Sequence, residues 1–228
     1  MIGIALSIVG TASATLVLVH GAWWTVLCTV AVRRPGSGAP ATLDRSPSCA
    51  VVVPAHNEEA LIGECVSSLL ASAQVAGGAT RVLVVADNCT DRTAEVARAA
   101  GATVIERSDP AQLGKPFALD FGLAWLGANE PPDFVAFVDG DCEVGLQFLP
   151  RVSARIAEGA EAVQGHYTTF EGGTSLQRLR RLALMLVHWS RPLGAQRLGI
   201  GTTLKGSGMG LRWELVRRGF GAHSVAED

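Results

Sequence analysis

The stretch that decides the fold is Asp133-Phe134-Val135-Ala136-Phe137-Val138-Asp139-Gly140-Asp141, an apolar run that ends in two carboxylates. Aromatic and β-branched residues in an unbroken run are typical of a strand buried on both faces of a parallel sheet. Alternate residues of an extended segment point to the same side, so Asp139 and Asp141 are able to face one ligand. Gly140 lets the backbone between them turn or approach closely.

Hard oxygen donors in this arrangement suit Mg²⁺ or Mn²⁺ bridging a diphosphate. A solvated turn that happens to contain two acids is the alternative reading. The metal site is favoured by its position, because open α/β sheets bind ligands at the carboxyl ends of their strands.

Similar apolar runs stand earlier in the chain, at 49–55 and 81–87, and each is followed by a polar loop. Helical patterns follow at 58–73, 91–100 and 115–125, with a shorter strand at 102–106. Strands that alternate with helices predict an α/β domain with a mostly parallel central sheet flanked by helices. Two of the polar loops, 54–59 and 87–91, then lie at the ligand-binding edge, although both also have the composition of helix caps.

Lys115 is one of only two lysines in the chain and stands between Gly114 and Pro116. It offers a point charge to a phosphate. The surrounding sequence is not a P-loop, because Asp109 replaces the first glycine and Pro116 the serine or threonine of that motif.

The N-terminal segment 2–32 contains no Asp, Glu, Lys or Arg. A helix of this length reaches about 45 Å, whereas the hydrocarbon core of a bilayer is about 30 Å thick. We therefore expect a transmembrane anchor at 1–33 and a linker at 34–47, before a catalytic domain at 48–228. Trp23 and Trp24 mark one membrane interface, and Arg33 and Arg34 predict a cytoplasmic domain at the inner membrane. A cleaved signal peptide is the rival reading. The apolar run is too long for one, and it lacks the basic region with which a signal peptide begins.

Composition limits the remaining possibilities. A chain of 228 residues with 48% apolar and 18% charged residues builds one substantial core with an appendage. A net charge of -2 gives no general attraction to nucleic acid. Five scattered cysteines predict buried thiols in a reducing compartment and neither a disulfide framework nor a zinc site.

The segment 174–200 contains five arginines interleaved with leucine, methionine and tryptophan, and it contains no acid. Two interpretations remain open for this segment. A basic amphipathic helix lies on an anionic membrane face, whereas a core helix presents its arginines to water.

Six motifs occur in order: PAHNEE, VVADNCTDRTAEVA, GKPFAL, FVDGD, KGSGMGLR and AED. In sequence and spacing they resemble the family 2 glycosyltransferases of the GT-A fold, and most of all the membrane-bound bacterial polysaccharide enzymes related to cellulose and hyaluronan synthases. The resemblance covers residues 48–228. It implies an inverting transfer of a sugar from a nucleotide-diphosphate sugar, of the UDP or GDP type, to the hydroxyl of a glycan or lipid-linked acceptor.

The resemblance also implies roles for individual residues. The nucleotide pocket would be lined by Pro54, Ala55, His56 and Glu58, with Asp87 near the base or ribose, Lys115 near the nucleotide and Asp139 near its ribose. Asp141, with Asp139, would bind the Mg²⁺ or Mn²⁺. Gly206, Ser207 and Gly208 would shape the donor and acceptor site. Asp228, in the pair Glu227-Asp228, would be the catalytic base.

Relatives of this type continue past the acidic base into a Q-x-x-R-W motif and further transmembrane helices. The expectation is therefore a fragment, a chain completed by a partner subunit, or an inactive chain. A membrane-tethered nucleotide-sugar-binding subunit without catalysis is the first alternative. A dinucleotide-dependent oxidoreductase is the second, from Gly206-Ser207-Gly208-Met209-Gly210, although the glycine pattern fails at Leu211.

Overall fold

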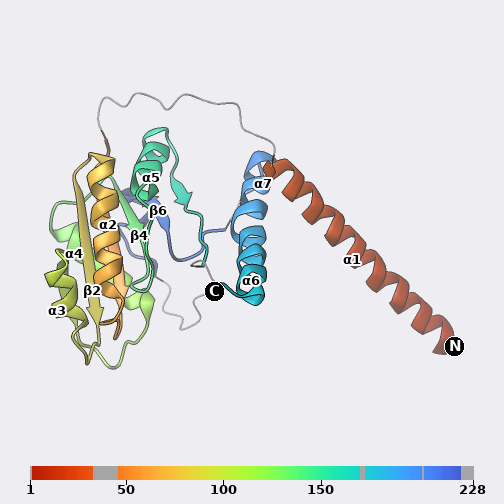
Figure 1. Cartoon of the computed structure of the whole chain (residues 1–228), viewed down its shortest axis with the longest axis horizontal. Helices are drawn as coiled ribbons and strands as arrows, with labels where there is room; N and C mark the ends of the chain where they lie inside the picture. Colours follow the sequence, from red (N-terminus) through yellow and green to blue (C-terminus); the bar gives the residue numbers. More distant parts are fainter. Residues whose placement is uncertain (1, 33–45, 170–172, 202, 222–228) are drawn as a thin grey trace. The chain divides into compact units, whose positions relative to one another are not determined.

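The computed structural model describes residues 2–32, 46–169, 173–201 and 203–221 (Figure 1). The chain forms two compact units, and each is described by itself. The smaller unit combines Met1–Gly38 with His166–Thr203, and the larger unit combines Ala39–Gly165 with Leu204–Asp228.

A six-stranded sheet forms the centre of the larger unit, in the order β3-β2-β1-β4-β6-β5. Strands β1, β2, β3 and β4 run parallel, while β6 pairs antiparallel with both β4 and β5. The strands are β1 (Cys49–Ala55), β2 (Thr80–Asp87), β3 (Thr103–Arg107), β4 (Phe134–Phe137), β5 (Ala162–Gln164) and β6 (Met209–Arg212). The mostly parallel α/β sheet predicted from the sequence is confirmed.

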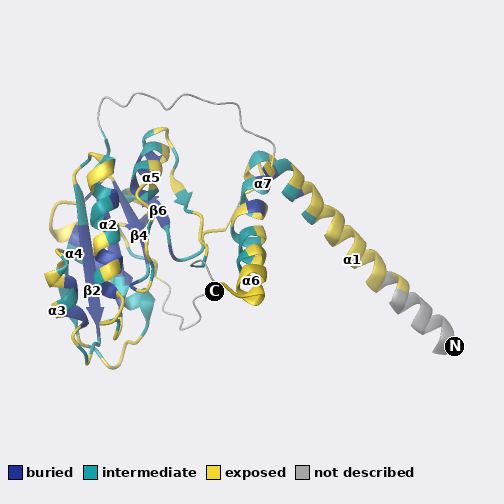
Figure 2. Ribbon diagram, viewed as in Figure 1, coloured by how far each residue is buried: buried dark blue, intermediate teal, exposed yellow. Residues whose placement is uncertain are grey.

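Helices cover both faces of this sheet (Figure 1). They are α2 (Ile62–Ala76), α3 (Thr93–Ala99), α4 (Lys115–Ala128), α5 (Phe148–Ala157) and α8 (Trp213–Val216). Because side chains alternate across a strand, Val51 and Val53 pack toward α2, whereas Ala50 and Val52 pack toward α4. Figure 2 shows the resulting buried layer along the strands. The apolar runs seen in the sequence are therefore strands buried on both faces.

Close packing fixes the helices against the sheet. Gly122 of α4 lies so near the strands that a Cβ atom there would stand 3.0 Å from Val85 Cγ2 and 3.1 Å from Val52 Cγ1. On the other face, a Cβ atom at Gly210 of β6 would stand 2.5 Å from Val152 Cγ1 of α5. A glycine at each position lets the layers approach.

The segment after Gly208 differs from the sequence-based expectation. The oxidoreductase alternative required a helix to start at the glycine-rich loop, because a dinucleotide phosphate binds at a helix N-terminus. Instead the loop leads directly into the antiparallel strand β6, whose residues Met209 and Leu211 pack into the core. The oxidoreductase interpretation is therefore wrong.

The expected boundaries shift at several element ends. Helix α2 begins at Ile62 and not at residue 58, because residues 58–61 form a turn, which the Leu61 amide closes by donating to the Glu58 carbonyl at 3.0 Å. Helix α4 starts at Lys115 as expected and runs three residues further than 125, to Ala128. The apolar run at 133–139 is a strand only over Phe134–Phe137. Its last residues bend into the loop that carries the two carboxylates.

The smaller unit consists of helices. It contains helix α1 (Ile2–Val32) and, after the part of the chain that belongs to the larger unit, three further helical segments. These are α6 (Ser175–Met185), the π-helical turn η1 (Leu186–Ser190) and α7 (Arg191–Arg197). Ser13–Val32 of α1, with a mean hydropathy of 1.7, is long and apolar enough to cross a membrane. It is a candidate span by length and composition.

Candidate functional site

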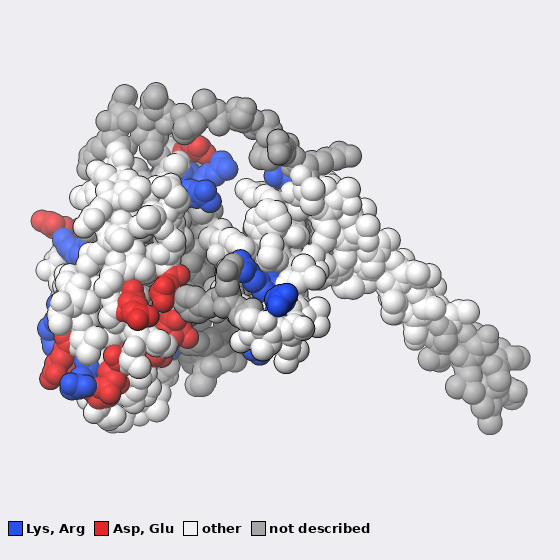
Figure 3. Space-filling model, viewed as in Figure 1, with Lys and Arg blue, Asp and Glu red and all other residues white. Residues whose placement is uncertain are grey.

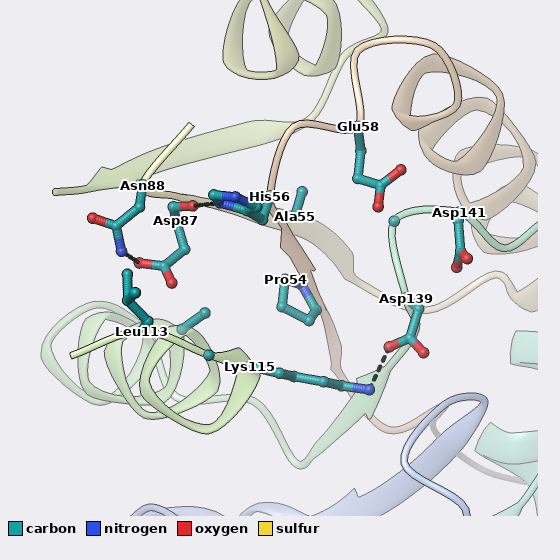
Figure 4. A pocket seen from close by; sticks show the side chains of 13 residues that line it. Pro54, Ala55, His56, Glu58, Asp87, Asn88, Leu113, Lys115, Asp139 and Asp141 are labelled. Carbon is teal, nitrogen blue, oxygen red and sulfur yellow. Dashed lines mark hydrogen bonds and ion pairs between the residues drawn. The ribbon is translucent and has the colours of Figure 1, made fainter. Parts of the chain in front are cut away.

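A cavity of about 440 Å³ opens at the carboxyl ends of β1, β2 and β4 (Figure 4). Its lining comes from the loops after these strands and from the start of α4. The lining residues are Pro54, Ala55, His56, Glu58, Asp87, Asn88, Leu113, Gly114, Lys115, Ala118, Asp139, Gly140 and Asp141. This is the sheet edge at which an open α/β fold binds ligands. Figure 3 shows acidic side chains gathered at the end of the larger unit toward which the arrow of β2 points in Figure 1.

One end of the cavity is acidic. The carboxylates of Asp139 and Asp141 and the thiol of Cys142 each offer a ligand atom, and these atoms lie within 4.8 Å of one another. Glu58 approaches the same space from the loop after β1 (Figure 4). Two carboxylates at this separation suit a hard divalent cation, which takes oxygen ligands. The two carboxylates, without the thiol, therefore fit a magnesium or manganese ion.

Charge repulsion acts on Glu58. Partial burial raises the pKa of its carboxyl above the ordinary value, and the negative charge of Asp141 raises it further. A cation at the acidic end would relieve this repulsion. The neighbouring thiols stay protonated at neutral pH, because burial raises the pKa of Cys142 to about 11 and that of Cys65 to about 12.

The loop that carries the two carboxylates is held in place by packing and by hydrogen bonds. Gly140 lies in van der Waals contact distance of β1 and α2, since a Cβ atom there would be 3.4 Å from both Ala55 Cβ and Ile62 Cδ1. The Asp139 amide donates to Ser207 Oγ at 3.1 Å. Ser207 belongs to the glycine-rich loop before β6, so the antiparallel strand positions the acidic end.

Lys115 spans the floor of the cavity from the first turn of α4. Its Nζ lies 2.6 Å from Asp139 Oδ1, and the two side chains form an ion pair (Figure 4). A Cβ atom at Gly206, which adopts φ +75°, would lie 3.6 Å from the same Nζ. The lysine thus places a positive charge beside the acidic end, where a diphosphate held by a cation would carry negative charge.

The opposite end of the cavity contains a buried ion pair. Asp87 Oδ1 lies 2.7 Å from a guanidinium nitrogen of Arg107, and the exposed fractions of the two side chains are 7% and 9%. Asn88 Nδ2 donates to the same carboxylate oxygen at 3.1 Å. The guanidinium of Arg107 also donates to the Gln112 carbonyl at 2.8 Å. Asp87 is therefore a fixed acceptor at the rim of the cavity.

His56 completes this end. Its Nδ1 lies 2.8 Å from the Asp87 carbonyl oxygen, so the ring is oriented by the backbone of β2. Because a carbonyl oxygen only accepts, Nδ1 is the donor in this contact. The amide of Asn57 and the loop after β2 lie beside it.

Several polar residues of the loops after β1 and β2 form hydrogen bonds that stabilise these two loops. Asn57 adopts φ 54° and accepts from the Thr90 amide at 2.8 Å, which ties the loop after β1 to the loop after β2. Asp91 accepts from the hydroxyl and amide of Thr93, and the hydroxyl bond is the main cause of its lowered pKa. The Glu58 amide donates to Thr93 Oγ1 at 2.7 Å. These bonds explain part of the polar composition as loop structure.

The structure brings most of the candidate residues together. Eight of them line the cavity, namely Pro54, Ala55, His56, Glu58, Asp87, Lys115, Asp139 and Asp141. The glycine-rich loop approaches through Gly206 and Ser207, as described above. Gly206, Ser207 and Gly208 are not among the lining residues of the cavity. The Gly208 amide donates to the Phe137 carbonyl at 2.8 Å and shapes the start of β6. Glu227 and Asp228 lie outside the described residues.

Sequence reasoning missed other residues of the site. Arg107, Leu113 and Gln164 were not singled out, although Arg107 closes β3 at the same edge as the other strand ends. Applying the strand-end argument to β3 would have found it. Gln164 had no such signal: it donates to the Ser207 carbonyl at 2.9 Å and accepts from the Lys205 amide at 2.7 Å. Its position depends on β5, which the sequence pattern does not reveal.

The fold and the cavity define an α/β domain with a cavity at the ligand-binding edge of its sheet, and the comparison with known families is specific. Residues 50–218 match the family described as Glycosyl transferase family 2. The chain therefore belongs to glycosyl transferase family 2. Membership agrees with the resemblance seen in the six sequence motifs.

Curated relatives come from an archaeon and from a bacterium. The chain is 36% identical over 121 residues to the low-salt glycan biosynthesis hexosyltransferase Agl6 of Haloferax volcanii. This alignment covers 51% of this chain and 26% of the relative. It is 31% identical over 134 residues to the dolichyl-phosphate hexose transferase of the same organism, covering 58% and 53%. A 4,4'-diaponeurosporenoate glycosyltransferase of Staphylococcus aureus is 38% identical over 97 residues, 41% of this chain and 24% of the relative. The chain thus spans about half or less of these relatives.

Solved structures support the same fold. Glucosyl-3-phosphoglycerate synthase from Mycobacterium tuberculosis, in complex with Mn²⁺, UDP-glucose and phosphoglyceric acid, aligns with a TM-score of 0.51 and 27% identity. The alignment covers 81% of this chain and 64% of that one. A mannosyltransferase from Pyrobaculum calidifontis, in complex with GDP-mannose and Mn²⁺, shares the fold at a TM-score of 0.50, with 21% identity over 66% of this chain and 46% of that one.

Proposed function

We propose that this chain is the catalytic part of an inverting glycosyltransferase, which transfers a hexose from a nucleoside-diphosphate sugar to an acceptor hydroxyl. The observation that carries the proposal is the convergence of Asp139, Asp141 and Lys115 on one cavity at the carboxyl edge of the sheet. A cation-binding pair beside a fixed lysine suits a diphosphate. Relatives whose names specify hexose transfer, and a neighbour that binds UDP-glucose, support the donor class.

The acidic end is proposed as the site of a Mg²⁺ or Mn²⁺ ion. Asp141 and Asp139 would hold it, and Glu58 lies close enough to feel its charge. When bound, such an ion would neutralise the charge that develops on the departing diphosphate. Lys115 adds a second positive charge at the same place and does not depend on the ion.

The opposite end is proposed to bind the nucleoside of a UDP- or GDP-type donor. Asp87 offers a carboxylate acceptor that Arg107 and Asn88 hold in place. A nucleobase presents N–H groups that such an acceptor binds. Pro54, Ala55 and His56 form the wall between this end and the acidic end (Figure 4).

The proposed reaction is a single displacement assisted by a base. The acceptor hydroxyl oxygen bonds to the anomeric carbon as the bond to the diphosphate oxygen breaks, and the base takes the hydroxyl proton. One displacement inverts the anomeric centre. Asp228, with Glu227 beside it, is proposed for this role from the family motif, and both residues lie outside the described part of the chain.

We further propose an anchor at 1–33, a linker at 34–47 and a catalytic domain at 48–228. The span within α1 supports an inner-membrane location with a cytoplasmic catalytic domain. The acceptor is then a glycan or a lipid-linked glycan that reaches the membrane surface. A partner subunit that supplies further elements belongs to the same proposal.

The test measures donor turnover by the full chain in detergent. Purified protein is incubated with UDP- and GDP-hexoses and Mn²⁺, and the released nucleotide is measured with water or a glycan as acceptor. We expect Asp141→Asn to lower the rate at least about 100-fold, the range for loss of a group that stabilises transition-state charge. Glu161→Gln, an exposed acid outside the cavity, is the matched control and keeps the rate.

Equal rates in the Asp141→Asn variant and the unmodified chain would overturn the metal assignment. Tight, metal-dependent nucleotide binding without any turnover would instead identify a nucleotide-sugar-binding subunit.

A further inference from the structure

Helix α6 of the smaller unit turns an apolar face toward solvent. Leu176, Leu179 and Leu182 have exposed fractions of 76%, 62% and 53%, and Leu186 and Trp189 of the following turn have 39% each. At 100° per residue the four leucines fall on one side of a helix. None of the α6 residues is buried. An exposed apolar stripe of this length marks an interaction surface.

Positive charge accompanies the stripe. Arg178 and Arg180 are exposed and Arg181 is partly exposed, and the described residues 173–201 contain no acid. Figure 3 shows Lys and Arg atoms over α6. A capping box at Thr174, whose hydroxyl accepts from the Gln177 amide at 3.2 Å, fixes the start of the helix. The surface therefore combines apolar side chains with cationic ones and favours an anionic partner.

Helix α7 attaches this surface to the C-terminal end of α1. Gly194 of α7 packs directly on the α1 backbone, because a Cβ atom there would overlap the Leu27 carbonyl oxygen. The Arg197 guanidinium donates to the Val30 and Ala31 carbonyls at 2.8 and 2.7 Å. The guanidinium carbon of Arg191 lies 5.5 Å from the ring centroid of Trp24. The contacts all fall between Trp24 and Ala31.

The length of α1 sets the level of these contacts in a bilayer. Helix α1 has 31 residues and reaches about 46 Å, which exceeds a hydrocarbon core of about 30 Å. The candidate span, Ser13–Val32, ends with the last residue of α1, so the C-terminal end of α1 marks one surface of the bilayer. The last turns of α1, on which α7 packs, then lie close to this surface. Helix α6 continues from α7 through η1 and starts from the same level.

We propose that α6 is an interfacial helix, which lies in the headgroup layer of an anionic bilayer with Leu176, Leu179, Leu182 and Leu186 toward the acyl chains. The arginines that flank the stripe would contact lipid phosphates. The inference rests on the proposed anchoring by α1 and is independent of sugar transfer. It assigns the bilayer, and not a second protein surface, as the occupant, because the stripe carries only positive charge and continues from a helix that suits a span.

The experiment places Trp189 relative to lipid. The full chain is reconstituted in vesicles that contain phosphatidylglycerol and lipids brominated near the headgroup, and tryptophan emission is compared with unbrominated vesicles. The difference between the unmodified chain and Trp189→Phe isolates the Trp189 emission. We expect this emission to be quenched. The matched control is Trp213→Phe, because Trp213 packs against the core of the larger unit, and the emission it isolates should not change.

Charge dependence is the second arm. Substituting Arg178 and Arg180, the two arginines that flank the stripe, with glutamine should lower the ratio of docked to undocked helix by about fivefold for each arginine, and Trp189 quenching should fall accordingly. Arg151→Gln with Arg218→Gln, two exposed arginines of the larger unit, should leave quenching unchanged.

Unquenched Trp189 emission in anionic vesicles would overturn the proposal. Equal quenching in vesicles of neutral phosphatidylcholine would overturn the role of the arginines. Loss of turnover with retained quenching would refute the proposed function alone.

Discussion

Asp87 and Arg107 form a charged pair with little access to water, so each depends on the other. Removing one partner of a buried pair leaves an uncompensated charge and costs about 3–5 kcal/mol of the free energy of unfolding. We expect Arg107→Met to lower stability by this amount, measured as a shift in the urea midpoint. The double variant Asp87→Asn with Arg107→Met should recover most of the loss, since no charge then remains buried.

The exposed pair Arg155–Glu158 is the control for this prediction. Its guanidinium–carboxylate distance is 2.9 Å, but the side chains are 69% and 36% exposed. Arg155→Met should therefore cost less than about 1 kcal/mol. A double variant at 87 and 107 as unstable as Arg107→Met would show that the arginine acts through packing on its neighbours and not through charge.

The raised pKa of Glu58 predicts that the stability of the fold depends on pH. Because its pKa is raised in the folded chain, ionising Glu58 opposes folding, and this penalty is fully present only above the folded pKa. Below the ordinary value of 4.5 the carboxyl is protonated in both states and the penalty vanishes. Glu58→Gln should thus raise the Tm of metal-free protein at neutral pH, and the gain should shrink as pH falls toward that value.

Thermal unfolding with EDTA at a series of pH values measures this effect. Glu161→Gln, an exposed acid, should have the same Tm as the unmodified chain throughout. A gain in Glu58→Gln that persists at pH 4 would mean that shape, and not charge, explains it.

At the scale of elements, the close contact between β6 and α5 allows a direct test of packing in the larger unit. A methyl group at Gly210 would overlap Val152 Cγ1, and valine is stiff at χ1, so the helix or strand must move. We expect Gly210→Ala to destabilise the fold by about 1–3 kcal/mol, as overpacking does. Adding Val152→Ala opens the space, so the double variant should be more stable than the sum of the single effects requires. Purely additive urea midpoints would contradict the contact.

The same elements show what the sequence predicts and what it does not. Strands β1, β2 and β4 are recognisable because both faces are buried and the runs are continuously apolar. Strands β5 and β6 are not, since Ala162–Gln164 has only three residues and Met209–Arg212 contains a glycine that packing requires. Helix α5 was also missed, although its buried residues Leu149, Val152 and Ile156 keep helical spacing.

The residues of the site also fall into those that the sequence predicts and those that it does not. The strand-end argument gathers Glu58, Asp87, Lys115 and Asp139, because parallel strands present their carboxyl ends at one edge. The bond from the Asp139 amide to Ser207 joins positions far apart in the sequence and depends on the antiparallel return of β6. No local pattern encodes that return.

At the scale of the whole molecule, the larger unit contains the cavity and the smaller unit contains the candidate span. The central claim is that the cavity binds a nucleoside diphosphate through a divalent cation. Calorimetric titration of UDP and of GDP into the full chain, with Mn²⁺ and then with EDTA, tests it most directly. The account predicts binding of one of the two nucleotides, weakened at least about tenfold by EDTA and equally by Asp141→Asn. Binding that is unchanged by both treatments would contradict it.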